Sequence, residues 1–143
     1  MGLLEKRSRC PFLWEGSPPE PSHQQICVVD DDESVADSLK SLLEIFGYDV
    51  RSYNSGVDFL ADDRRRATGC LVIDQHMPGM NGLDVVARLQ KQRARMPTIL
   101  ISGRLDTKTR ERAASLGVAN VLEKPFAAGH LVDLIRTALW ERN

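Results

Sequence analysis

Cys70-Leu71-Val72-Ile73 is an unbroken apolar run, and Asp74 follows it directly. Apolar residues without polar alternation are typical of a strand that is covered on both faces, as in a parallel sheet. Similar short runs occur before it, at Ile26–Val29, and after it, at Thr98–Ile101. Helical patterns separate these runs, so the chain is predicted to alternate buried strands with helices.

The remaining segments fit the same alternation. Strands are predicted at 26–29, 48–53, 70–73, 98–101 and 120–123. Helices are predicted at 35–46, 55–61, 83–92, 107–116 and 131–139, with Gly47 closing the first and Asp106 capping the fourth. The predicted fold class is therefore α/β, a doubly wound five-stranded parallel sheet with helices on both faces. In such sheets the functional site lies at the carboxyl ends of the strands.

Composition excludes several classes of protein. The chain has 143 residues, a formal net charge of −1 and 42% hydrophobic residues, as expected for one globular domain rather than a strongly basic nucleic-acid binder. It contains no apolar run of the roughly 20 residues that a membrane span needs, and no signal-peptide pattern, so the cytoplasm is the expected location. Cys10, Cys27 and Cys70 are odd in number and form no C-x-x-C pair. We expect reduced thiols, with Cys27 and Cys70 packed inside strands.

The first residues differ in texture from the rest. Residues 1–24 hold four of the seven prolines and show no sustained period, so we expect a flexible N-terminal tail before a domain at 25–143. The Phe12-Leu13-Trp14 cluster could dock on a partner or on the domain, but an unstructured extension is the favoured interpretation.

Chemically reactive residues follow four of the predicted strands. They are Asp30-Asp31-Asp32-Glu33, Asp74, Ser102-Gly103 and Lys124-Pro125. Each has an ordinary alternative as a helix cap, a turn residue, a loop start or a surface lysine. Together, however, they would place several carboxylates, a hydroxyl and an ammonium at one sheet edge. That set suits a Mg²⁺ ion whose coordination shell also includes a phosphate oxygen.

At this point the sequence resembles a known family, the receiver domains of two-component response regulators (the CheY-like superfamily). The resemblance covers about Gln25 to Trp140. It rests on four ordered motifs: Val28-Val29-Asp30-Asp31-Asp32-Glu33-Ser34-Val35, Val72-Ile73-Asp74-Gln75-His76-Met77-Pro78-Gly79-Met80-Asn81-Gly82, Leu100-Ile101-Ser102-Gly103 and Glu123-Lys124-Pro125-Phe126. It implies a flavodoxin-like (βα)5 fold with strand order 2-1-3-4-5.

The resemblance also implies the metal site and the acceptor. Asp74 would accept the phosphoryl group. Asp31 would bind Mg²⁺ directly, Asp30 mainly through water, and Asp74 and the backbone carbonyl of His76 would complete the protein ligands.

Two further residues would act on the phosphoryl group. Ser102 would donate its hydroxyl to it, and Lys124 would pair with Asp74 and then with the phosphoryl oxygens. Lys124-Pro125 is where the family usually has a cis peptide. The implied donor is a phosphohistidine on a sensor histidine kinase or phosphotransfer protein, and the implied output is an altered surface for a downstream effector. The chain would be a signalling domain and not an enzyme.

Two positions depart from the family pattern. Val121 stands where an aromatic residue usually reports the active state, which implies a switch that is damped or read through other contacts. His76 lies where side chains tune dephosphorylation, and could either assist water or shield the acyl phosphate.

Other questions stay open at the level of sequence. No output domain follows Trp140, so the chain is either a stand-alone regulator, the face-value interpretation, or a receiver cut from a longer regulator. It looks most like receivers of helix-turn-helix transcription regulators. Leu131 to Trp140 could form a homodimer seam, although core packing is favoured.

Two rival classes are weaker. A haloacid-dehalogenase phosphatase needs a second Asp where this chain has His76. A direct nucleic-acid binder would have to use the basic residues, but a charge run is usually a solvated face. These basic residues are Arg64-Arg65-Arg66, Lys91, Arg93 and Arg95.

Overall fold

A single parallel sheet forms the centre of the protein. The computed structural model describes residues 25–142, so the predicted tail at 1–24, with Cys10 and Phe12-Leu13-Trp14, lies outside the described residues. The sheet has five strands in the order β2-β1-β3-β4-β5, all paired in parallel. The strands are β1 (Gln25–Val29), β2 (Asp49–Tyr53), β3 (Thr68–Asp74), β4 (Thr98–Ser102) and β5 (Asn120–Glu123). The predicted fold class and strand order are confirmed.

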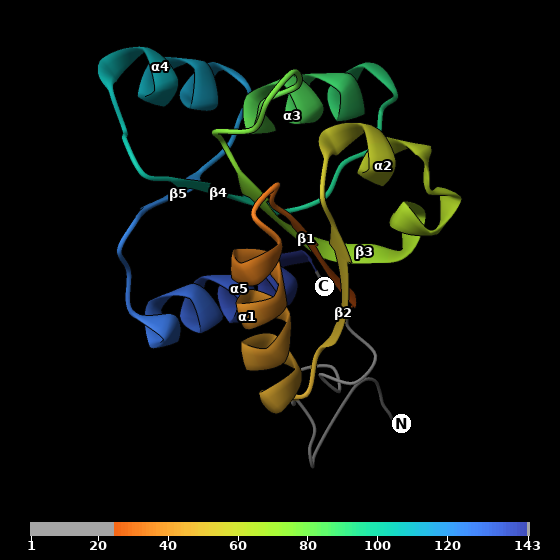
Figure 1. Cartoon of the computed structure of the whole chain (residues 1–143). Helices are drawn as coiled ribbons and strands as arrows, with labels where there is room; N and C mark the ends of the chain where they lie inside the picture. The colour runs from red at the N-terminus through yellow and green to blue at the C-terminus, as the bar shows by residue number, and fades with distance from the viewer. Residues whose placement is uncertain (1–24, 143) are drawn as a thin grey trace, which may run out of the picture.

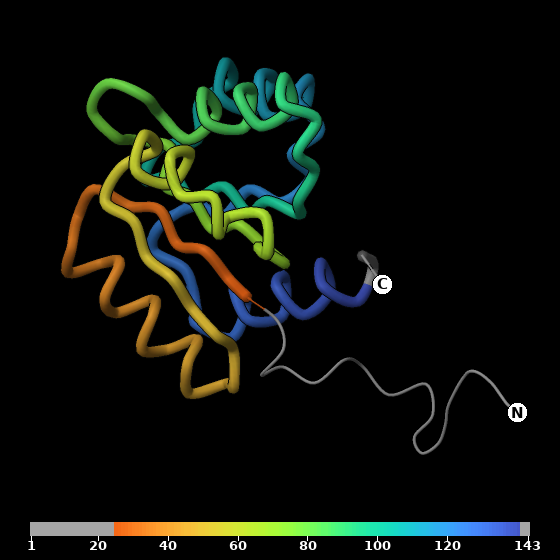
Figure 2. The backbone as a smooth tube through the Cα atoms, turned by 90° about the vertical axis from the view of Figure 1, so that its right-hand side faces the viewer, coloured from red at the N-terminus to blue at the C-terminus, as the bar shows by residue number. Residues whose placement is uncertain are grey.

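Helices cover both faces of this sheet. They are α1 (Glu33–Ile45), α2 (Gly56–Ala61), α3 (Gly82–Lys91), α4 (Thr107–Ser115) and α5 (Ala128–Arg142). Figure 1 shows α1 and α5 on one side of the sheet and α2, α3 and α4 on the other. The view turned by 90° in Figure 2 shows the same three layers.

The core is divided by the sheet into two apolar clusters. Alternate residues of β3 point to opposite faces: Val72 packs with the cluster under α1 and α5, whereas Leu71 and Ile73 pack with the cluster under α3. All three are buried. Burying one such side chain contributes about 1.5–3 kcal/mol relative to leaving it exposed. Burial of both faces explains why the strand sequences show no polar alternation.

Polar side chains cap the helices that lead away from the strand ends. Asp32 is the N-cap of α1 and accepts hydrogen bonds from the backbone N–H groups of Ser34 and Val35. Asp106 caps α4 as predicted. Asn81 and Asp84 form a reciprocal capping box on α3. The acidic run 30–33 therefore divides into a capping residue, Asp32, and acids that remain available for other roles.

Some details of the sequence interpretation were wrong. The first helix was predicted to run to Phe46 but ends at Ile45, and Phe46 is 44% exposed. Phe46 is the C-cap, and Gly47 at φ 93° turns the chain towards β2, so the helix ends one residue earlier than predicted. A 3₁₀ helix at Asp63–Ala67 was not predicted, and it carries Arg64-Arg65-Arg66.

The last helix and the cysteines agree with expectation. The apolar residues of α5 point into the core: Leu131, Ile135, Ala138 and Leu139 are buried, whereas Trp140 is 52% exposed. Core packing therefore accounts for the apolar pattern of α5. Cys27 and Cys70 are buried within β1 and β3. Among residues 25–142, no helix combines the length and apolarity that crossing a membrane requires.

Gly82 offers a direct test of how tightly the sheet edge is packed. A Cβ added to Gly82 would lie 2.7 Å from the backbone oxygen of Asp74 and 2.9 Å from Leu100 Cδ1. Since backbone cannot yield as a flexible side chain does, Gly82→Ala should lower the free energy of unfolding by about 1–3 kcal/mol. The measurement is urea unfolding.

Gly129→Ala is the matched control, because a Cβ there meets nothing within 4 Å. That helical substitution should be neutral or stabilising by at most about 1 kcal/mol. Equal effects of the two substitutions would contradict the packing described here.

Candidate functional site

The carboxyl ends of four strands bring charged and polar residues together. Asp30 follows β1, Asp74 ends β3, Ser102 ends β4 and Lys124 follows β5. Asp30, Asp74 and Ser102 are buried, at 3%, 6% and 0% exposure. Burial of such groups is uncommon unless they are paired, so this edge differs from an ordinary set of loops.

Three carboxylates converge at this edge. One oxygen from each of Asp30, Asp31 and Asp74 lies within 4.8 Å of the others, and Asp31 is exposed. Desolvation by burial raises the pKa of both Asp30 and Asp74 above the usual range. Hard oxygen donors around one point fit Mg²⁺, which prefers carboxylates and keeps several waters. The residues present therefore fit the metal that the family implies.

Lys124 supplies the opposing charge. Its Nζ lies 3.8 Å from Asp30 Oδ2 and 3.8 Å from Asp74 Oδ1. The ammonium group lowers the pKa of Asp74 and so partly offsets the desolvation that raises it. The Lys124-Pro125 peptide is cis, and the Lys124 N–H donates to the Ser102 carbonyl at 2.9 Å. The backbone of β5 is thereby tied to β4 at the residue that carries the cation.

The loop after Asp74 is held by Gln75, a residue that sequence reasoning did not single out. Gln75 is buried, and its side-chain oxygen accepts the N–H of Leu83 at 2.9 Å. Its backbone N–H donates to the Ile101 carbonyl, and its carbonyl accepts from Gly82. The sequence gives no sign that Gln75 makes these hydrogen bonds, because they depend on how α3 packs against the sheet.

His76 connects both sides of the site. Its backbone N–H donates to Asp74 Oδ1 at 3.4 Å, and its ring Nε2 lies 2.8 Å from Ser102 Oγ. Ser102 Oγ also donates to the Arg104 carbonyl at 2.7 Å and accepts from the Arg104 N–H at 3.1 Å. Sequence reasoning placed His76 near the acceptor but did not foresee its contact with Ser102.

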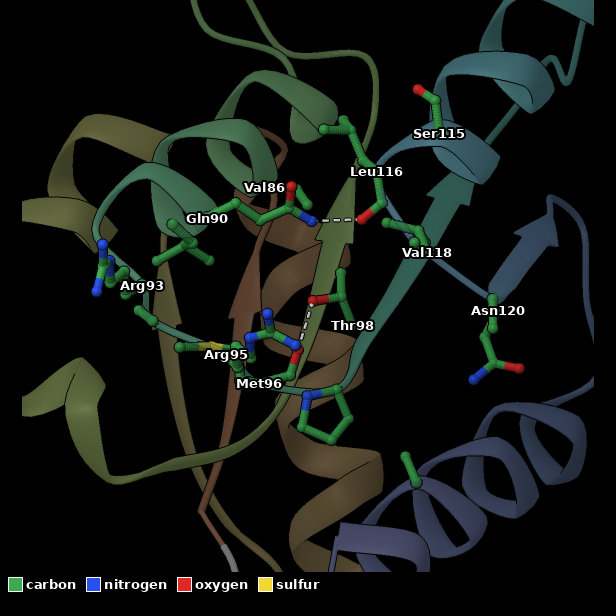
Figure 3. A pocket seen from close by; sticks show the side chains of 16 residues that line it. Val86, Gln90, Arg93, Arg95, Met96, Thr98, Ser115, Leu116, Val118 and Asn120 are labelled. Carbon is green, nitrogen blue, oxygen red and sulfur yellow. Dashed lines mark hydrogen bonds between the residues drawn. The ribbon is translucent and has the colours of Figure 1, made fainter.

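The other residues considered from sequence lie elsewhere. Val121 is partly buried against the cluster under α3. A hollow of about 1110 Å³ is lined by Arg93, Arg95, Thr98 and Asn120, and Figure 3 shows Gln90 donating to the Leu116 carbonyl across it. Thr98 and Asn120 begin their strands, so this hollow lies at the amino ends of the strands, whereas Asp74 lies at the carboxyl end of β3.

Comparison with known proteins agrees with the geometry. The family described as response regulator receiver domain matches residues 26–136. The chain is 40% identical over 114 residues to response regulator protein TmoT of Ectopseudomonas mendocina, covering 80% of this chain and 52% of the relative. It is 35% identical over 119 residues to transcriptional regulatory protein FixJ of Azorhizobium caulinodans, covering 83% of this chain and 56% of the relative.

Solved structures give the same result. A CheY-like receiver domain protein from Methanospirillum hungatei JF-1 superimposes with a TM-score of 0.78 at 26% identity, over 83% of this chain and 95% of that one. The structure of FixJ-N gives a TM-score of 0.75 at 31% identity, over 81% of this chain and 93% of that one.

The chain belongs to the response regulator receiver domain family of two-component systems. Membership makes this a signalling domain. The chain spans about half the length of the curated relatives it matches, at 52% of TmoT and 56% of FixJ.

Removing one buried carboxylate tests the charge balance of the acidic cluster. Asp30→Asn keeps the shape and the acceptor for the Asp32 N–H, which Asp30 Oδ1 accepts at 2.9 Å. Because the neutral amide costs less to bury, we expect the metal-free protein to be more stable by about 1 kcal/mol or more. We also expect the stabilisation by added Mg²⁺ to be largely lost. Thermal unfolding in EDTA and in a Mg²⁺ series measures both.

Asp32→Asn is the control. Asp32 caps α1 outside the cluster, and Asn caps a helix as well as Asp does. That variant should keep the baseline stability and the Mg²⁺ response of the parent. A Mg²⁺ response that survives Asp30→Asn unchanged would remove Asp30 from the metal site.

Proposed function

We propose that this chain takes a phosphoryl group onto Asp74 from a phosphohistidine of a sensor histidine kinase or a histidine phosphotransfer protein. The observation that carries the proposal is the position of the Asp74 carboxylate. It is buried at a strand end, 3.8 Å from the Lys124 ammonium and beside two further carboxylates. One acid is therefore held where incoming negative charge can be neutralised.

The reaction is a phosphoryl transfer between two side chains. An Asp74 carboxylate oxygen forms the new bond to phosphorus, the P–N bond of the donor breaks, and the donor imidazole keeps the electron pair and takes up a proton. The product on this chain is an acyl phosphate. Mg²⁺ would be held by Asp31 directly, by Asp30 mainly through water, by Asp74 and by the His76 carbonyl, and would supply neutralisation of the phosphoryl oxygens.

Lys124 and Ser102 complete the site from neighbouring strands. Lys124 approaches Asp74 on one side and would pair with the phosphoryl oxygens after transfer. Ser102 would donate its hydroxyl to the same group. Inward movement of these two residues would bias the α4–β5–α5 face between two arrangements that a downstream effector distinguishes. Val121 offers no aromatic ring to report this change, so the switch would be either damped or carried by other contacts of that face.

The same site argues for slow self-limited turnover rather than enzymatic catalysis. His76 stands where a phosphatase of the dehalogenase type would need a second aspartate as general acid. His76 would instead tune the attack of water on the acyl phosphate. The formal net charge of −1 supports a protein partner over direct binding to nucleic acid. A homodimer through α5 would have to use its outward face, on which Trp140 is 52% exposed.

Chemical phosphorylation tests the acceptor. Incubation with acetyl phosphate and Mg²⁺ should add the mass of one phosphoryl group to the intact protein. Asp74→Asn should abolish the adduct, because the amide is not a nucleophile of comparable strength. Asp32→Asn should keep it. Intact-protein mass spectrometry reads all three samples, and an adduct that persists in Asp74→Asn would exclude Asp74 as the acceptor.

A further inference from the structure

The hydroxyl of Ser102 has no hydrogen-bonding capacity left. A serine hydroxyl has one proton to donate and two lone pairs to accept with. The Arg104 carbonyl, 2.7 Å away, cannot donate, so the one serine proton lies on that contact. The Arg104 N–H occupies one lone pair at 3.1 Å. The remaining lone pair faces His76 Nε2 at 2.8 Å.

This count fixes the direction of the His76 contact. Because the Ser102 hydroxyl already donates its one hydrogen bond to the Arg104 carbonyl, it can only accept from His76. His76 Nε2 must therefore be the donor. The imidazole therefore donates to the serine and does not accept from it. A neutral ring in this position is the Nε2–H tautomer, and a base role for His76 towards Ser102 is excluded in this arrangement.

The His76 ring has no competing contact among residues 25–142. Its only ring hydrogen bond there is the one to Ser102, and His76 is an exposed residue. Ser102, in contrast, is 0% exposed. An exposed residue of the loop after β3 thus contacts the buried hydroxyl at the end of β4.

We propose that His76 is a positioning residue that holds Ser102 in its unphosphorylated arrangement. The inference rests on the proposed function of Ser102 as a donor to the phosphoryl group. To donate to that group, the Ser102 hydroxyl must break its hydrogen bond to the Arg104 carbonyl and turn towards Asp74. Rotation about the Cα–Cβ bond of Ser102 breaks the His76 contact at the same time. The hydrogen bond from His76 therefore favours the resting state and opposes the switch.

The expected effect is modest and has a definite sign. Removing the hydrogen bond from His76 to Ser102 with His76→Leu should tighten the binding of beryllofluoride, a phosphoryl mimic. The expected change is about 2–10-fold, the range for one neutral hydrogen bond. His76→Gln should retain the parent affinity, because the glutamine amide can place an N–H near the position of Nε2. His76→Asn is too short to do so and should behave as His76→Leu. The measurement is an NMR titration of the full chain with beryllofluoride at fixed Mg²⁺.

A double-mutant cycle separates positioning from a general structural effect. In the Ser102→Ala background there is no hydroxyl to hold, so His76→Leu should change the beryllofluoride affinity little. Persistence of the full change in the Ser102→Ala background would overturn the proposal. Weaker beryllofluoride binding by His76→Leu in the parent background would also overturn it, because His76 would then favour the phosphorylated state.

A second readout concerns the unliganded protein. The ¹⁵N spectrum of His76 should show a proton on Nε2, and its signal should shift on Ser102→Ala. An unprotonated Nε2 would contradict the proposed hydrogen bond from His76 to Ser102. The two levels of the account fail differently: a wild-type chain that binds no beryllofluoride contradicts the proposed function, whereas normal wild-type binding with an unchanged His76→Leu contradicts only the role of His76.

Discussion

Two buried carboxylates facing one ammonium group constrain the whole site. Asp30 and Asp74 are nearly inaccessible to water, and Lys124 lies 3.8 Å from each of them. Isolated buried charges are costly, and one cation shared between two anions offsets the cost only in part. With Asp31 added, three carboxylates oppose one ammonium, which leaves an excess of two negative charges. That excess suits a divalent cation, so the cost of burying these acids together and their capacity for metal have the same origin.

The sheet meets this constraint by geometry alone. The acids and the lysine come from β1, β3 and β5, which lie in one sheet with β4 between β3 and β5. Tight packing behind Asp74, where Gly82 leaves no space for a Cβ, fixes the backbone at the end of β3. The hydrogen bond from the Lys124 N–H to the Ser102 carbonyl ties the backbone of the lysine to β4. Under the proposed function, supports on both sides would let small movements of Ser102 or Lys124 act on the neighbouring surface.

Sequence and structure agree where periodicity and strand ends carry the information. The apolar runs predicted the strands, and the residues following them predicted the meeting of Asp30, Asp74, Ser102 and Lys124 at one edge. Features that depend on tertiary contact were not predictable. Gln75 carries no pattern that announces its bond to the Leu83 N–H, and the contact between His76 and Ser102 requires the spacing of β3 and β4 to be known. Gly47 was correctly predicted to close the first helix, but periodicity alone did not show that Phe46 is its exposed C-cap.

Locating the phosphoryl linkage on the chain tests the central claim most directly. Borohydride reduces an acyl phosphate of aspartate to homoserine, so peptide mapping of the reduced, phosphorylated wild-type protein identifies the carboxylate that was modified. Convergence of the acids around Lys124 predicts homoserine at position 74 alone. Homoserine at position 30 or 31, or spread over several surface acids, would show that the cluster does not select one nucleophile and would contradict the account.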